Sequence, residues 1–143
     1  MNDKNNDGLT PLHFVCQSGV DSQIVNLFLN FKANPNCLDE EENSPLHIAS
    51  AAKVLCPLVI SSLIKHRANI NLKNKRKDGP LHFLTRRHPL DFEVIKIFLD
   101  NGSNISTKNI NKETPFTQIL NNNSLYSKLF DLFIKSDLYF QNK

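Results

Sequence analysis

The chain has 143 residues, 40% of them hydrophobic and 22% charged, with a formal net charge of +3. This composition is ordinary for one soluble domain and excludes global disorder, and the mild charge neither requires nor forbids nucleic acid. Residues 1–7 show no signal-peptide pattern, and the longest apolar stretch, 54–64, is about half of the ~20 residues that a membrane span needs. Three cysteines are too few for a disulfide scaffold. We therefore expect a cytoplasmic or nuclear protein that makes no membrane contact.

One short motif recurs four times and predicts the start of a helix each time. Its copies are Thr10-Pro11-Leu12-His13, Ser44-Pro45-Leu46-His47, Gly79-Pro80-Leu81-His82 and Thr114-Pro115-Phe116, and their prolines lie 34, 35 and 35 residues apart. Threonine or serine suits the N-cap, where its hydroxyl can accept from a free amide of the first turn. Proline suits the first helical position, where no N–H is needed. We expect short helices beginning at these four prolines.

A second block follows each motif at a strict spacing of 35 residues and predicts a longer helix. Its copies span 24–30, 59–65, 94–100 and 129–135, and each carries apolar residues on one broad face. The block is followed by Ala33-Asn34-Pro35-Asn36 and by its echoes at 68–71 and 103–106, which favour a helix end and a turn. Neither helix of a unit can bury its apolar face alone, so the units must stack.

These three motifs, in this order, resemble ankyrin repeats over about residues 7–138. The resemblance implies an all-α solenoid of stacked helix-turn-helix units with β-hairpin-like fingers. We expect a single ankyrin-repeat domain, 1–143, with repeats at approximately 5–38, 39–73, 74–108 and 109–140. Repeat four departs most from the pattern, because Thr117 replaces the histidine.

The C-terminal end of the chain is unusually apolar for a terminal repeat. Large apolar residues continue through 129–134 and again at 138–140. A terminal repeat should be polar on its outer face, so this tail leaves three alternatives: an improvised cap, a longer array or an end-to-end dimer. We expect a monomer in preference to a homodimer.

The spacing of the motif histidines His13, His47 and His82 does not predict a metal site. Successive copies should lie about 10 Å apart along the stack. Zinc ligands must converge within about 2.0–2.3 Å of one ion. The resemblance implies instead that each histidine bonds the cap hydroxyl and neighbouring backbone. In repeat three, Gly79 offers no hydroxyl, and we expect Asp78 to compensate in part.

The sequence offers no active site. His13 and Cys16 stand at i, i+3 and could pair a base with a nucleophile, but Cys16 occupies a packing position and no third residue orients the pair. Glycine-rich phosphate loops and the common hydrolase and metalloprotease motifs are absent. We predict that the protein is not an enzyme and that it uses no metal or cofactor.

Two neighbouring excursions between repeats carry opposite charges. The acidic one holds Asp39, Glu40, Glu41 and Glu42, and the basic one holds Lys73, Lys75, Arg76 and Lys77. Arg86 and Arg87 should lie near the basic one on the same face. The simpler interpretation is solvated turn charge. The functional interpretation is a bipolar edge at which these ten residues bind a partner protein.

The resemblance implies a scaffold for protein–protein interaction that binds on the concave face, formed by the fingers and the first helices. This expectation rests on analogy between folds. An alternative is an architectural spacer within a larger multidomain protein. Nucleic acid is a weaker alternative, because no aromatic residue is interleaved with the basic ones to stack on bases, and four acidic residues stand beside them.

Overall fold

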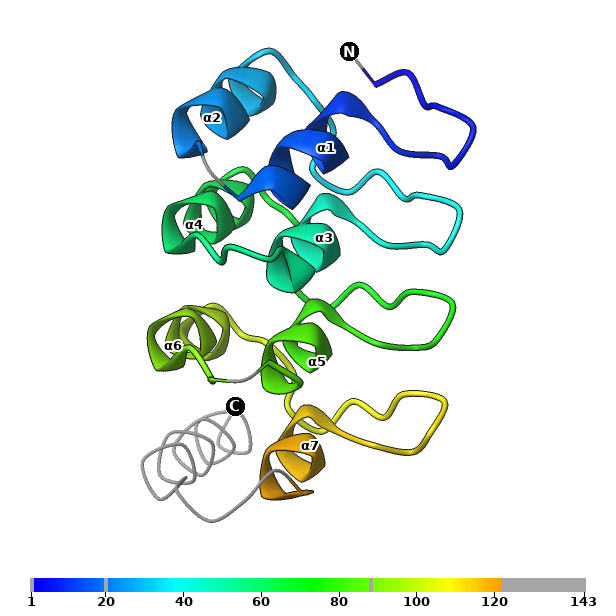
Figure 1. Cartoon of the computed structure of the whole chain (residues 1–143), viewed down its shortest axis with the longest axis vertical. Coiled ribbons are helices and arrows are strands. Elements are labelled where there is room, and N and C mark those ends of the chain that lie inside the picture. The colour runs from blue at the N-terminus through cyan, green and yellow to red at the C-terminus, as the bar shows by residue number, and fades with distance from the viewer. Residues whose placement is uncertain (1, 20, 88, 122–143) are drawn as a thin grey trace.

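The computed structural model describes residues 2–19, 21–87 and 89–121. Seven helices lie in these ranges: α1 (Pro11–Ser18), α2 (Ser22–Asn30), α3 (Pro45–Ala51), α4 (Pro57–Lys65), α5 (Pro80–Thr85), α6 (Phe92–Asp100) and α7 (Pro115–Asn121). Figure 1 shows α1, α3, α5 and α7 stacked in one layer, with α2, α4 and α6 beside them and four hairpin-shaped fingers projecting from the opposite side of the first layer. The predicted all-α repeat stack is confirmed. None of the helices in these ranges is long and apolar enough to cross a membrane.

Each first helix begins at the proline that the motif predicted. Thr10, Ser44 and Gly79 are N-caps with extended backbone, and a proline follows each of them. The second helices end at Asn30, Lys65 and Asp100, where the predicted blocks end, and begin two residues before them. The fourth predicted block, 129–135, and the apolar tail at 138–140 lie outside the described residues.

The core lies between the two layers of helices and continues from repeat to repeat. The motif leucines Leu12, Leu46 and Leu81 are at most 2% exposed, and the second helices contribute Val25, Ile60 and Ile95, each 0% exposed. Each first helix packs on the next first helix, and each second helix packs on the next second helix. One continuous apolar cluster therefore joins the repeats, as a solenoid requires.

Each finger is closed by a turn that begins at an asparagine or aspartate. These residues are Asn5, Asp39, Asn74 and Asn109, and the backbone amide of each donates to the carbonyl four residues later. The fourth residue of each turn has a positive φ, and these residues are Gly8, Glu42, Lys77 and Lys112. The fingers are hairpin-like in shape, but the described residues contain no β-strand.

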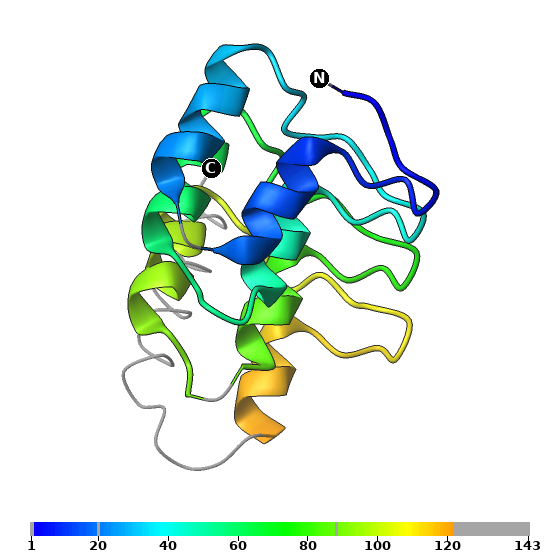
Figure 2. The same cartoon turned by 45° about the horizontal axis from the view of Figure 1, so that its top comes forward.

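Adjacent fingers are held in register by one backbone hydrogen bond each. The amide of Glu40 donates to Asp7 O over 3.0 Å, that of Lys75 to Glu41 O over 3.1 Å, and that of Ile110 to Arg76 O over 3.0 Å. These bonds place the tips of successive fingers side by side (Figure 2).

A ladder of asparagines links the repeats behind the fingers. Asn36 Oδ1 accepts from Asn69 N over 2.6 Å, and Asn71 Oδ1 accepts from Asn104 N over 2.8 Å. The sequence predicted only turn chemistry for these asparagines. Their second role, bonding across to the next repeat, depends on the stacking and has no local signature.

Candidate protein-interaction surface

His13 and His47 tie neighbouring repeats together. His47 Nδ1 accepts from Ser44 N over 3.1 Å and lies 2.9 Å from the serine Oγ, while Nε2 donates to Asp78 O in the next repeat over 3.1 Å. His13 bonds Thr10 and Asn43 O in the same way. The structural role that the resemblance implied for both histidines is confirmed.

Burial keeps these imidazoles neutral. Desolvation lowers the pKa of His47 from 6.5 to about 4, and it lowers the pKa of His13 and His82 as well. Among the described residues, no three His, Cys, Asp or Glu side chains gather as a metal site would require. The neutral rings therefore hold neighbouring repeats together by hydrogen bonds.

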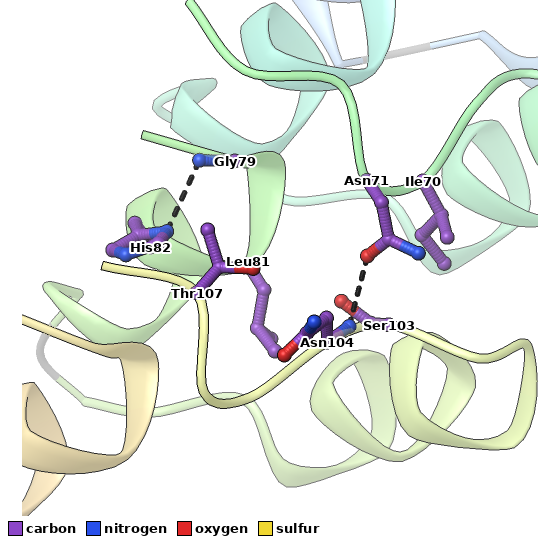
Figure 3. A pocket seen from close by; sticks show the side chains of 8 residues that line it. All are labelled: Ile70, Asn71, Gly79, Leu81, His82, Ser103, Asn104 and Thr107. Atoms are coloured by element: carbon purple, nitrogen blue, oxygen red, sulfur yellow. Dashed lines mark hydrogen bonds between the residues drawn. The ribbon is translucent and has the colours of Figure 1, made fainter. Parts of the chain in front are cut away.

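In repeat three the same joint lacks its hydroxyl. His82 Nδ1 still accepts from Gly79 N over 3.1 Å, but a cavity of about 10 Å³ has Gly79, His82 and Thr107 among the residues that line it. Figure 3 shows all the residues that line this cavity. The cavity is about the size of one water molecule. His82 therefore loses only the hydroxyl, and keeps its backbone bond.

Asp78 does not take the place of the missing hydroxyl by a hydrogen bond to His82, because its carboxylate has other partners. Its carboxylate, 1% exposed, accepts from Arg86 over 2.9 and 2.6 Å and from Asn109 Nδ2 over 2.9 Å. These donors hold the pKa of Asp78 below its ordinary value, although burial alone would raise it. The Arg86 guanidinium also lies 5.9 Å from the ring centre of Phe83. Arg86 is thus anchored at the base of the basic finger.

The sequence analysis expected Arg87 to lie near the basic finger, but the structure places it elsewhere. Its guanidinium donates to Ala52 O over 2.6 Å and to Lys53 O over 3.4 Å, at the carbonyl end of α3. A cation there satisfies carbonyls that have no partner within the helix. Arg86 and Arg87 therefore both hold structural bonds, and sequence spacing alone could not reveal their partners.

The other charged residues of the predicted edge divide into an acidic and a basic fingertip. In the acidic tip, Glu40, Glu41 and Glu42 are exposed, whereas Asp39 turns inward and accepts from Asn43 N over 2.7 Å. The basic tip consists of Lys73, Lys75, Arg76 and Lys77, all exposed. Within the described residues, no ion pair joins the two tips. Their role in binding stays a prediction.

An apolar row on the first helices was missed by the sequence analysis. Phe14, Ile48 and Phe83 all stand at the fourth helical position; Phe14 is 49% exposed and the other two are partly exposed. Phe83 lies on the side of α5 that faces the fingers, because its ring is next to the Arg86 guanidinium, which binds Asp78 at the base of a finger. The sequence did contain a signal for this row, because a large apolar residue follows each of the three motif histidines.

Cys16 and Cys37 are buried free thiols. Burial raises the pKa of Cys16 to about 12, and it raises that of Cys37 as well. The Cys37 thiol lies 3.3 Å from the Thr10 hydroxyl, where it packs against the first helix cap. Both thiols are therefore protonated at neutral pH, which is unsuited to nucleophilic attack.

Comparison with known proteins agrees with this architecture. A family model of ankyrin repeats in three copies matches residues 1–74, which is 74 of the 143 residues. The chain belongs to the ankyrin-repeat family. Ankyrin repeats are generally protein–protein interaction modules and are typically not enzymatic.

One curated relative of this ankyrin-repeat chain is a much longer protein. The human transient receptor potential cation channel subfamily A member 1 is 39% identical over 49 residues, which cover 34% of the chain and 4% of the channel. The chain therefore matches only a small part of that relative, and the similarity is one of repeats.

Proposed function

We propose that this ankyrin-repeat chain binds a partner protein through its concave face and the edge of its fingers. The observation that carries the proposal is the pair of oppositely charged fingertips. The bond from Lys75 N to Glu41 O holds the tips side by side, and no ion pair between described residues joins one tip to the other. Arg76 lies 4.0 Å from Asp78, and the exposed charges of both tips remain available to a partner.

The charged tips and the apolar row would contribute differently to binding. An exposed ion pair is worth only about 0–1 kcal/mol, so the tips favour orientation and partner choice over affinity. The row of Phe14, Ile48 and Phe83 offers the partly exposed aromatic and aliphatic surface that typically supplies affinity.

The order of charges along the stack defines the chemistry of the partner segment. It would place basic residues against Glu40, Glu41 and Glu42 and acidic residues against Lys75, Arg76 and Lys77. Packed helices lie about 8–10 Å apart, and an extended chain rises about 3.3 Å per residue. The two charged groups of an extended partner would therefore stand about three residues apart.

The test is a charge reversal with a matched control. The partner captured from the source cell is titrated with the wild-type chain and with Lys75→Glu, Arg76→Glu, Lys77→Glu. We expect affinity to fall at least about tenfold, and to fall with salt in the wild type. The control reverses the exposed Lys53, Lys65 and Lys96, which changes the net charge equally away from the fingers.

Two outcomes would contradict the proposal. Equal losses of affinity in both triple variants would show that the charges attract the partner only nonspecifically. The fingertips would then be solvated turns with no specific role in binding. Changing Glu40, Glu41 and Glu42 to lysine distinguishes a protein partner from nucleic acid. The change should weaken the binding of a protein partner that carries both charges, whereas strengthened binding would indicate nucleic acid and contradict the proposal.

A further inference from the structure

The helix α2 exposes a row of large apolar side chains at one end of the stack. Ile24 is 43% exposed, Leu27 54% and Phe31 64%. Their spacing of three and four residues places them on one side of the helix. Figure 2 shows α1 and α2 at the open end of the stack, with no described element in front of them. This row of Ile24, Leu27 and Phe31 is the α2 face.

The same positions are covered in the next two repeats. The second helices match at a spacing of 35 residues, so Ile24 corresponds to Val59 and Val94, which are 1% and 0% exposed. Leu27 corresponds to Ser62, which is 8% exposed. Ile24 and Leu27 are therefore exposed at positions that the two following repeats bury or partly bury. The third position, that of Phe31, is half-buried as His66 and exposed as Asn101.

In those repeats each second helix packs on the second helix of the preceding repeat. α4 packs on α2, and α6 packs on α4. His66, which corresponds to Phe31, has its Nε2 3.3 Å from Asn30 Oδ1 at the end of α2. The α2 face thus occupies the side that each later repeat turns toward its predecessor.

The finger side of repeat one already has the register of an internal repeat. Asn2 Oδ1 accepts from Asn34 N over 2.9 Å, just as Asn36 Oδ1 accepts from Asn69 N over 2.6 Å. The ladder of asparagines therefore extends to this end of the stack in the geometry that follows a second helix elsewhere.

We propose that the α2 face docks the second helix of a further ankyrin-type repeat, stacked in the register that the described repeats already use. This surface is separate from the concave face and the finger edge. The occupant follows from continuity with the interface between repeats: α4, which carries the buried Val59, packs on α2, and α6, which carries the buried Val94, packs on α4. The partner surface is thus aliphatic and helical, and the contact is one of repeat on repeat.

The experiment adds such a repeat from the chain itself. A copy of residues 39–73 replaces residues 1–4 and is joined directly to Asn5. Asn5 corresponds to Asn74, which follows Lys73 in the original chain, so the new junction between Lys73 and Asn5 keeps the spacing of the repeats. Leu27→Lys is then made in the original and in the extended chain, and thermal unfolding is followed by circular dichroism. We expect a loss in Tm of less than about 2 °C in the original chain, where residue 27 is exposed, and of more than about 5 °C in the extended chain, where it becomes covered.

The matched control is Leu58→Lys on α4. Leu58 is 65% exposed, and the corresponding positions of α2 and α6 carry the exposed Gln23 and Glu93. This variant should lower Tm by less than about 2 °C in both chains. An equally small effect of Leu27→Lys in both chains, or an extended chain no more stable than the original, would overturn the proposal. So would a dimer of the original chain that Leu27→Lys dissociates, because a second copy would then be the occupant.

Discussion

Two junctions of the stack use the same motif and stabilise it differently. Between repeats two and three, His47 is bonded by the Ser44 hydroxyl and amide and donates to Asp78 O over 3.1 Å. Between repeats three and four, His82 has only the amide of Gly79, a cavity stands beside it, and its Nε2 lies 3.4 Å from Glu113 O. The shared backbone geometry shows that the motif sets the junction, and that the hydroxyl only strengthens it.

The weaker junction is supported by a charged polar network, where the other junction has in the same place the neutral bond from Asn74 Nδ2 to Asn43 Oδ1 over 2.8 Å. Asp78 joins Arg86 and Asn109, and Thr85 Oγ1 donates to Gln118 Oε1 across the junction over 2.7 Å. Repeat four has no motif histidine, but Thr117 Oγ1 accepts from Thr114 N over 2.8 Å in the same place. The third junction therefore relies on charge and side-chain hydrogen bonds more than on histidine.

The largest expected effect is that of pH on the histidine junctions. The pKa of His47 is lowered by burial to about 4 from 6.5, so its neutral form stabilises the fold above pH 6.5 and that stability is lost as the pH falls toward 4. This shift corresponds to about 3 kcal/mol, and the lowered pKa of His13 and His82 adds to it. Urea unfolding from pH 7 to pH 4 should show this decline, and a stability that is constant down to pH 4.5 would contradict the buried neutral rings.

Next in size is the contrast between the two histidines. His47→Ala removes three hydrogen bonds at a site that is 0% exposed, and we expect a loss of about 3 kcal/mol. His82→Ala should cost about 1 kcal/mol less, because no hydroxyl is left unpaired and the cross-repeat bond is longer. Chemical unfolding at pH 7.5 measures both, and equal losses would show that the hydroxyl does not strengthen the junction.

A smaller loss is expected from Asp78→Ala, which tests the network of the third junction. The change removes the buried acceptor of Asn109 Nδ2, which keeps only its longer bond to Glu113 Oε2 at 3.2 Å, whereas Arg86, whose side chain is 36% exposed, can turn to water. The expected loss is about 2 kcal/mol. Lys96→Met is the control, since its partner Asp100 is exposed and the pair should contribute less than about 0.5 kcal/mol. Equal effects of the two variants would show that the network does not stabilise the junction.

The smallest effect is a gain from Gly79→Thr. The backbone there has a φ of −89°, which any residue adopts, and an added Cβ would lie 3.5 Å from Leu72 O. The hydroxyl would enter the cavity beside His82, and we expect stabilisation by about 0.5–1 kcal/mol. Gly79→Ala is the control without a hydroxyl, and Thr10→Gly should give the opposite sign. Destabilisation by Gly79→Thr would mean that the cavity is needed.

Sequence reasoning succeeded where the cause of structure is local. The prolines marked the helix starts at Pro11, Pro45 and Pro80, because cap and first-turn chemistry are contained within four residues. It failed where the cause is the stacking itself. The bond of Arg87 to Ala52 O joins two repeats that only the packing brings together. The pairing of Arg86 with Asp78 joins residues on either side of α5, within one repeat, and also required the structure.

The candidate surface shows the same division. The charges of the acidic and basic tips were evident from the sequence, but the inward turn of Asp39 and the positive φ of Glu42 and Lys77 depend on the turn that closes each finger. The bond between Lys75 N and Glu41 O, which sets the tips side by side, required the structure.

The most direct test of the proposed function is amide hydrogen exchange of the chain with and without its captured partner protein. Our account predicts added protection at residues 40–42 and 75–77 and along α1, α3 and α5, with little change along α4 and α6. Protection confined to α4 and α6, with unchanged exchange at the fingertips, would contradict it.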